Sequence, residues 1–196
     1  MLVSPLRQRP ALRVLGMHDC LLAGPIPPGL VECTALTTLD LAGNQLSGPI
    51  PQGLSRCTAL RVIVMQNNRL SGRIPSGLGA CTRLERLCLN GNQLEGPVPP
   101  SLGSCLGLQE LRLHSNPSLE APLPMALGEC AALMQLSVDA AVLHEIPEAL
   151  NRRRDMGDLT VLSPGSVSLG SDLSAGSVSF LRRYSSFSSK NEAGPA

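Results

Sequence analysis

The chain has 196 residues, which is room for one ordinary domain or one short repeat array and not for a receptor that carries its own kinase. Sixteen Lys and Arg residues against fifteen Asp and Glu residues give a formal charge of +1, so no strong net field favours nucleic acid or an anionic membrane surface. The only aromatic residues, Phe180, Tyr184 and Phe187, lie in the last 17 positions, so the preceding core must be aliphatic. Leucine occurs 36 times beside 19 Gly and 17 Pro, a composition that favours a leucine-spaced repeat.

The first eleven residues form a short lead, in which Pro5, Arg7 and Arg9 interrupt the apolar stretch that a secretory signal needs. No apolar run approaches the roughly 18 residues that cross a bilayer. The sequence also has no glycosylation sequon, because the triplet at 116–118 has proline in its middle position. These features predict a cytoplasmic chain with no membrane span, or an extracellular one if the N-terminus is truncated.

A period of 24 residues runs through the chain from residue 12 to about residue 150. The shared pattern is L-x-x-L-x-L-x-x-N-x-L-x-G-x-I-P-x-x-L-x-x-C-x-x, and it resembles the leucine-rich repeat family, in its plant-type L-x-G-x-I-P subclass. The resemblance implies an α/β-type solenoid: a right-handed horseshoe segment with about six repeats in residues 12–146. The leucines that open the repeats are Leu12, Leu36, Leu60, Leu84, Leu108 and, after one inserted residue, Leu133.

The physics of one repeat can be read from residues 36–41. Leu36, Leu39 and Leu41 point inward from a short extended segment, and Thr38 and Asp40 point outward, as the period of two in a strand requires. Each repeat therefore contributes one strand, and successive strands stack in parallel about 4.8 Å apart. The Gly and Pro residues that follow predict irregular or 3₁₀ turns on the convex side.

One asparagine recurs where the chain leaves each strand, and a buried amide there can satisfy backbone groups of successive turns. We expect an asparagine ladder that fails at both ends, where Cys20 and Ala141 take the position. The ladder members are Asn44, Asn68, Asn92 and Asn116.

The pattern decays after Leu133. Pro147 can open a helix, and residues 159–162 can form a last strand, so residues 147–162 are interpreted as a makeshift C-terminal cap. Residues 163–196 contain eleven serines and no leucine frame, which predicts a disordered tail. Within it Ser185 follows Arg182 and Arg183 and is a candidate phosphorylation site.

Five of the seven cysteines recur with the repeat period, so register explains them better than disulfides or metal binding. These five are expected to be free, inward-facing thiols: Cys33, Cys57, Cys81, Cys105 and Cys130. Cys88 falls between two inward leucines and is expected to face outward, where it could be reactive.

No constellation in the sequence indicates catalysis. His18, Asp19 and Cys20 contain the atoms of a nucleophilic triad, but consecutive residues cannot direct three side chains to one point. His114 and His144 have no neighbouring ligand cluster, so the sequence predicts no metal site, no cofactor and no enzyme.

The outward side chains of the strands form the concave surface that solenoids offer to partners. Because Arg61, Arg86 and Arg112 lie on successive predicted strands, we expect one exposed basic stripe, flanked by glutamates. The leading hypothesis is a non-catalytic protein-binding scaffold that takes a protein or peptide on this face. The alternatives are a fragment or soluble relative of a plant-type receptor ectodomain that senses a peptide or glycan, and a regulatory subunit switched by its serine-rich tail; the oligomeric state is left open. The predicted partner-binding residues are Arg61, Val64, Gln66, Glu85, Arg86, Asn90, Glu110, Arg112 and His114.

Overall fold

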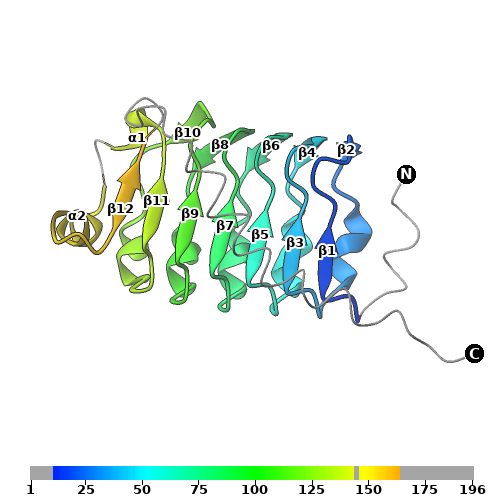
Figure 1. Cartoon of the computed structure of the whole chain (residues 1–196), viewed down its shortest axis with the longest axis horizontal. Coiled ribbons are helices and arrows are strands. Elements are labelled where there is room, and N and C mark those ends of the chain that lie inside the picture. The colour runs from blue at the N-terminus through cyan, green and yellow to red at the C-terminus, as the bar shows by residue number, and fades with distance from the viewer. Residues whose placement is uncertain (1–10, 144–145, 164–196) are drawn as a thin grey trace, which may run out of the picture. The chain divides into compact units, whose positions relative to one another are not determined.

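A computed structural model describes residues 11–143 and 146–163 of the chain, and these form a solenoid of stacked turns (Figure 1). One face is a parallel sheet of seven three-residue strands, each paired with the equivalent residues one repeat away, such as Leu15 with Leu39 and Leu39 with Ile63. The predicted stack of short parallel strands is therefore confirmed. In sheet order the strands are β1 (Val14–Gly16), β3 (Thr38–Asp40), β5 (Val62–Val64), β7 (Arg86–Cys88), β9 (Glu110–Arg112), β11 (Gln135–Ser137) and β12 (Thr160–Leu162).

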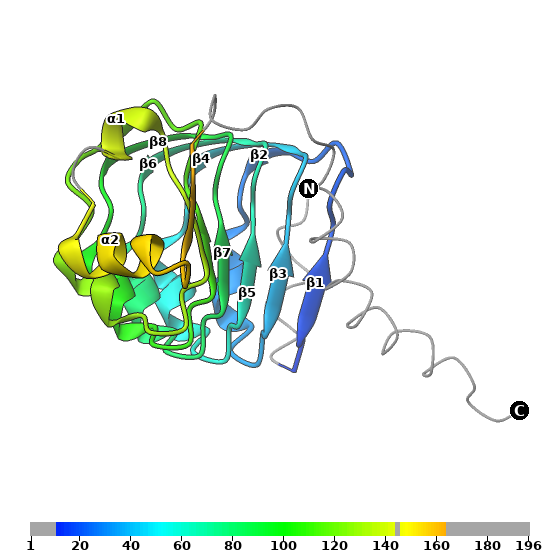
Figure 2. The same ribbon diagram turned by 60° about the vertical axis from the view of Figure 1, so that its left-hand side comes forward.

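A second parallel sheet lies along the adjoining edge of the solenoid, where the sequence predicted only a turn (Figure 2). The L-x-G-x-I-P segments are extended here, and Gly48, Gly72 and Gly96 hold φ near +70°, a region that favours glycine. The expectation of one strand per repeat was therefore wrong, because this extended segment also finds hydrogen-bonding partners one repeat away. The strands are β2 (Ala23–Pro25), β4 (Gln45–Pro49), β6 (Arg69–Arg73), β8 (Gln93–Pro97) and β10 (Ser118–Glu120).

The convex side consists of short 3₁₀ helices, as predicted. Each follows a proline, such as Pro51 with φ −61°, whose fixed dihedral turns the chain off the second sheet. Each ends at the recurring cysteine, whose backbone N–H bonds back to the leucine carbonyl three residues earlier. The helices are η2 (Pro28–Glu32), η3 (Gln52–Arg56), η4 (Ser76–Ala80), η5 (Pro100–Ser104) and η6 (Met125–Glu129).

The core is one continuous aliphatic column between the three sides. The leucines of the central repeats are fully buried, and the five periodic cysteines are 0 % exposed, which confirms their inward position. Burial raises the pKa of these thiols, to about 11 at Cys57 and about 12 at Cys105. None of the seven cysteines, all of which lie among the described residues, forms a disulfide.

The two ends of the described solenoid differ. After β11 come α1 (Ala140–Leu143) and α2 (Glu148–Asp155), then β12, which pairs with β11. The α2 helix packs against η6, and the Arg153 guanidinium donates hydrogen bonds to the carbonyls of Cys130 and Leu133. At the other end, the inward residues Leu12, Leu15 and Met17 are only partly buried. Among the described residues, α2 thus covers η6 after the last repeat, and the inward residues of the first repeat are less completely covered than those of the central ones.

None of the helices in residues 11–143 and 146–163 has the length and apolar character needed to span a bilayer. Ser185, and all of the predicted tail except its first residue, lie outside the described residues.

Candidate binding surface

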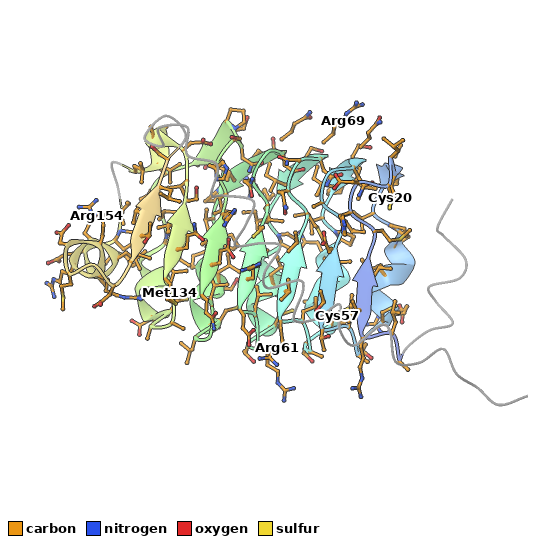
Figure 3. All side chains as sticks on the ribbon, in the orientation of Figure 1. Cys20, Cys57, Arg61, Arg69, Met134 and Arg154 are labelled. Carbon is orange, nitrogen blue, oxygen red and sulfur yellow. The ribbon has the colours of Figure 1, made fainter. Side chains whose placement is uncertain are left out.

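The concave face is defined here as the set of outward side chains on the seven-stranded sheet together with the residues just before and just after its strands. All nine predicted binding residues lie on it, because a strand directs alternate side chains to one side and the repeat brings equivalent positions together. Figure 3 shows Arg61 at the lower end of this face and Arg69, from the second sheet, at the upper edge.

The charged residues of the concave face form ion pairs across repeats. Arg61 pairs with Glu85, one repeat further along. Glu110 is shared by two guanidinium groups: Arg86 Nε lies 2.5 Å from its Oε2, and Arg112 contacts its Oε1. The glutamates expected to flank the basic stripe thus form ion pairs with its arginines, because strand stacking places a glutamate within reach of each arginine.

Burial distinguishes the pairs that share Glu110 from the pair of Arg61 and Glu85. The side chains of Arg86, Glu110 and Arg112 are 18 %, 7 % and 16 % exposed, whereas Arg61 is 48 % exposed. Ion pairs exposed to water contribute little, and partly buried ones are costly to break from one side. In this inner cluster of Arg86, Glu110 and Arg112, two guanidinium groups share one carboxylate, and the buried Asp40 lies close enough to act on the same Cys88 thiol.

Cys88 stands on the concave side of β7, between these charges, as its place in the frame predicts. It is only 5 % exposed, and burial, with Glu110 adding to the effect, raises the pKa of its thiol to about 12. The expectation of a reactive thiol was wrong, since a thiol with this pKa holds almost no thiolate near neutral pH.

The upper row of the concave face lies at the ends of the strands. Gln66 and Asn90 occupy equivalent positions in adjacent repeats, and within the described residues the buried Gln66 Oε1 and Asn90 Oδ1 atoms have no hydrogen-bond partner. In the next repeat His114 Nδ1 lies 2.7 Å from Ser137 Oγ. Burial lowers the pKa of His114, and Arg112 lowers it further, while Asp139 raises it.

Asp139 is a structural residue that the sequence analysis did not single out. Its carboxylate accepts hydrogen bonds from the backbone N–H groups of Ser115 and Asn116, at 2.8 and 3.1 Å. In earlier repeats the corresponding N–H groups bond to backbone carbonyls of the next turn, as Asn92 does to Ser115. The sequence signal that could have identified Asp139 is a carboxylate at the position where the chain leaves the repeat frame to enter α1.

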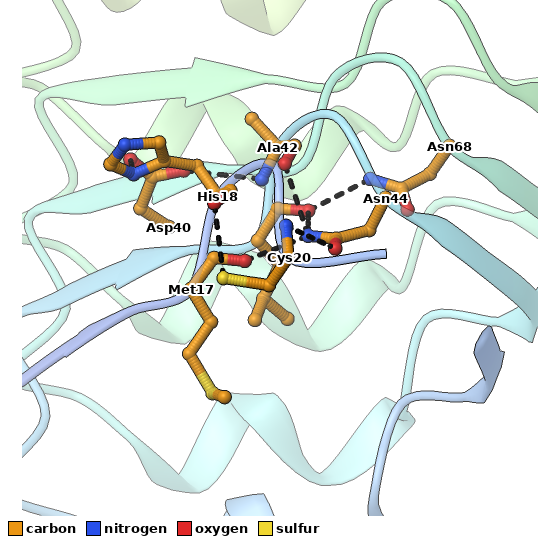
Figure 4. A network of polar contacts seen from close by, with 8 residues as sticks. Met17, His18, Cys20, Asp40, Ala42, Asn44 and Asn68 are labelled. Atoms are coloured by element: carbon orange, nitrogen blue, oxygen red, sulfur yellow. Dashed lines mark hydrogen bonds and ion pairs between the residues drawn. The ribbon is translucent and has the colours of Figure 1, made fainter. Parts of the chain in front are cut away.

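The asparagine ladder is present at all four predicted positions. Asn44 Oδ1 accepts from the backbone of Cys20 and Leu22, and its Nδ2 donates to carbonyls of its own turn and the preceding one (Figure 4). Asn68, Asn92 and Asn116 repeat this arrangement on Leu46, Leu70 and Leu94. The ladder thus joins successive turns directly beneath the upper row of the concave face.

The three adjacent residues that contain triad atoms do not converge. His18 Nδ1 lies 3.4 Å from Oδ2 of Asp40, in the next repeat, and the Cys20 thiol contacts the His18 carbonyl rather than its ring (Figure 4). Among the described residues no group of three His, Cys, Asp or Glu side chains is placed to hold a metal ion. An open depression at the lower edge of the face is lined by Arg61, Arg83, Glu85 and Gly107.

The comparisons agree with this architecture. The family model Leucine Rich Repeat matches residues 35–57, 59–81 and 83–105, and comparison with curated proteins gives no match. Among solved structures, a plant peptide hormone receptor, RGFR1, in complex with RGF2, is similar with a TM-score of 0.70 and 30 % identity over 79 % of this chain and 24 % of that one.

Two Arabidopsis structures show the same likeness. The receptor kinase HAESA, in complex with the peptide hormone IDA and the co-receptor SERK1, has a TM-score of 0.65 and 37 % identity over 68 % of this chain and 22 % of that one. The BIR2 ectodomain has a TM-score of 0.55 and 33 % identity over 58 % and 59 %. The chain thus spans about a quarter of the two hormone-bound receptors. With its recurring strand, asparagine and L-x-G-x-I-P segment, the chain carries leucine-rich repeats over residues 35–105 and is similar to plant receptor ectodomains built from such repeats.

Proposed function

We propose that the chain is a non-catalytic scaffold that binds an extended peptide segment of a partner protein on its concave face. The observation that carries the proposal is the inner cluster of Arg86, Glu110 and Arg112, in which two guanidinium groups share one carboxylate on the concave face. A carboxylate of a ligand would accept charge-assisted hydrogen bonds from the Arg112 guanidinium.

The upper row supports the same class of ligand. Gln66 Oε1 and Asn90 Oδ1 are acceptors without a donor in the described part of the chain, and a buried acceptor left unpaired is unfavourable. Because both residues are only partly buried, rotation of their side-chain amides would present these oxygens to the N–H groups of an extended backbone that crosses neighbouring repeats. The proposed ligand is therefore an extended peptide with at least one acidic group, bound across β5, β7 and β9.

The low aromatic content limits the affinity to be expected. None of the residues on this face is aromatic, and interface hot spots are enriched in Tyr and Trp as well as in Arg. Modest affinity that depends on salt is the expected behaviour.

The test is selection of a random peptide library on the immobilised protein, followed by titration calorimetry of the selected peptides. Arg112→Gln should weaken their binding at least tenfold, which corresponds to about 1.4 kcal/mol. Arg69→Gln, on the second sheet (Figure 3), is the matched control and should leave binding unchanged. Selected peptides that bind Arg112→Gln as tightly as the parent, with both proteins folded by thermal melt, would contradict the proposal.

A second candidate, a segment or soluble relative of a receptor ectodomain, is favoured by the neighbours, one named a peptide hormone receptor and another an ectodomain. This likeness supports the extracellular address, and the comparisons give no support to the cytoplasmic one. The third hypothesis, output through a phosphorylated tail, concerns residues outside those described.

A further inference from the structure

The second position after each recurring cysteine departs from the repeat at one place in the solenoid. Three repeats have alanine there, at Ala35, Ala59 and Ala132, whereas two adjacent repeats have Arg83 and Gly107. Both residues lie in turns that lead from a 3₁₀ helix into the sheet, from η4 into β7 and from η5 into β9. Because β7 and β9 pair in register and neighbouring strands lie about 4.8 Å apart, the two departures lie side by side at the lower edge of the concave face.

These two residues line the open depression at this edge, together with Arg61 and Glu85. A Cβ built on Gly107 would meet nothing closer than the carbonyl oxygen of Leu84, at 4.0 Å. The glycine therefore leaves open space in the wall of the depression, and a small group from outside the chain can enter it.

The charges around the depression favour a ligand carboxylate. Arg61 Nε donates to Glu85 Oε1 at 2.9 Å, so these two side chains engage each other. Arg83 is exposed, and within residues 11–143 and 146–163 its side chain makes no hydrogen bond or ion pair. Its guanidinium group presents donors in a planar fork that matches a carboxylate. Glu85 disfavours a dianion such as a phosphate group at the same place, because its own negative charge repels the additional one.

An exposed apolar residue adjoins the depression. Leu106 immediately precedes Gly107 and is 61 % exposed, although the equivalent residues of the other repeats are threonine or alanine. One repeat further along the same edge, Met134 is 65 % exposed, and it lies at the lower end of the face, as Arg61 does (Figure 3). Apolar side chains exposed beside a charged depression are typical of a surface that binds another protein.

We propose that this depression is a second docking site, which takes a short segment of a partner protein in which an Asp or Glu residue is followed by an apolar residue. The carboxylate of that segment accepts hydrogen bonds from the Arg83 guanidinium, and the apolar side chain covers Leu106. The site is independent of the peptide site proposed above, because its residues precede the strands, whereas Arg112 is the last residue of β9.

The probe for this site is the blocked dipeptide acetyl-Glu-Leu-amide, titrated into the ¹⁵N-labelled protein and followed by NMR at the backbone N–H groups of Leu106 and Gly107. These two signals should shift and reach saturation. The uncharged acetyl-Gln-Leu-amide should bind at least about fivefold more weakly, because it lacks the charge-assisted hydrogen bonds to Arg83. The same dipeptide with phosphoserine in place of glutamate should also bind more weakly than the glutamate form, because Glu85 repels the second charge.

Substitutions that restore the residue of other repeats test the site without disturbing the fold. Arg83→Ala should abolish the saturable shifts, and Leu106→Thr should weaken binding as read at the Gly107 signal. Arg69→Ala, an exposed change on the second sheet, is the control and should bind as the parent does. Arg112→Gln should also leave these shifts unchanged, so failure of this site and failure of the peptide site are distinguishable.

Three results would overturn the proposal. The first is a parent protein whose Gly107 signal shows no saturable shift with acetyl-Glu-Leu-amide. The second is equal binding of the glutamate and glutamine dipeptides, or tighter binding of the phosphoserine form. The third is binding that survives Arg83→Ala.

Discussion

Replacement of Asn92 by leucine tests the ladder where the structure permits its contribution to be worked out. Asn92 Oδ1 is the side-chain acceptor of the Leu70 N–H at 3.0 Å, and its Nδ2 donates to the carbonyls of Met65 and Leu89 at 3.0 and 2.9 Å. Each of these carbonyls also accepts from another ladder asparagine, from Asn68 at Met65 and from Asn116 at Leu89. The substitution would therefore leave the carbonyls with one amide donor each and deprive the Leu70 N–H of its side-chain acceptor.

Loss of a buried partner costs about 1 to 3 kcal/mol, so Asn92→Leu should lower the free energy of unfolding by that amount. For a domain of this size each kcal/mol corresponds to about 2 to 4 °C in Tm. Circular dichroism during urea and thermal unfolding measures both quantities. Gln93→Leu, at an exposed position next to Asn92 and outside the ladder, is the control and should change stability by less than about 0.5 kcal/mol. If Asn92→Leu melts with the parent, or no lower than the control, the amide is not what joins these turns.

Three further outcomes follow from the structure. When the native protein is titrated with a thiol reagent, Cys20 should react fast and Cys88 slowly, because burial raises the pKa of Cys88 to about 12. The unfolded, non-reduced protein should yield close to seven reactive thiols, and three or fewer would refute the assignment of free thiols. Glu110→Gln should reduce the free energy of unfolding, measured in urea, by about 1 to 3 kcal/mol, since two guanidinium groups lose their shared carboxylate. Glu32→Gln, in the exposed ion pair with Arg56, should reduce it by less than about 1 kcal/mol. Equal effects would show that burial does not cause the difference. Burial lowers the pKa of His114 below its ordinary 6.5, so below pH 6.5 the unfolded chain binds more protons than the folded one and the free energy of unfolding falls with the pH. His114→Gln should make this fall shallower in urea melts taken at several pH values. If the dependence on pH is unchanged in the variant, groups other than His114 cause it.

The sequence was sufficient to predict the stacking of repeats, the ladder and the buried cysteines. Each of these depends on a position that recurs with the period of 24, so one inference about residues 36–59 applied to every turn. Local chemistry also settled the 3₁₀ turns, because a proline at the same place in each repeat fixes the backbone dihedral there. The frame likewise placed the nine predicted binding residues on one face, although their role in binding is still a proposal.

The second sheet required tertiary information. Its segments carry Gly and Pro, which by themselves indicate a turn, and they become strands only because the same extended segment lies one repeat away on either side. Asp139 is a similar case, since its carboxylate replaces backbone carbonyls only where the chain leaves the frame for α1.

The electrostatics of the concave face also depended on the fold. Sequence separation places Arg86 and Glu110 24 residues apart, and only the stacking of β7 on β9 makes them an ion pair. The same stacking surrounds Cys88 with charged side chains and buries it, although its position in the strand frame was assigned correctly. The repeat period alone determined which side chains share a face, whereas their exposure, pairing and pKa were decided by neighbours one turn away, because side-chain contacts between turns are not encoded in any single repeat.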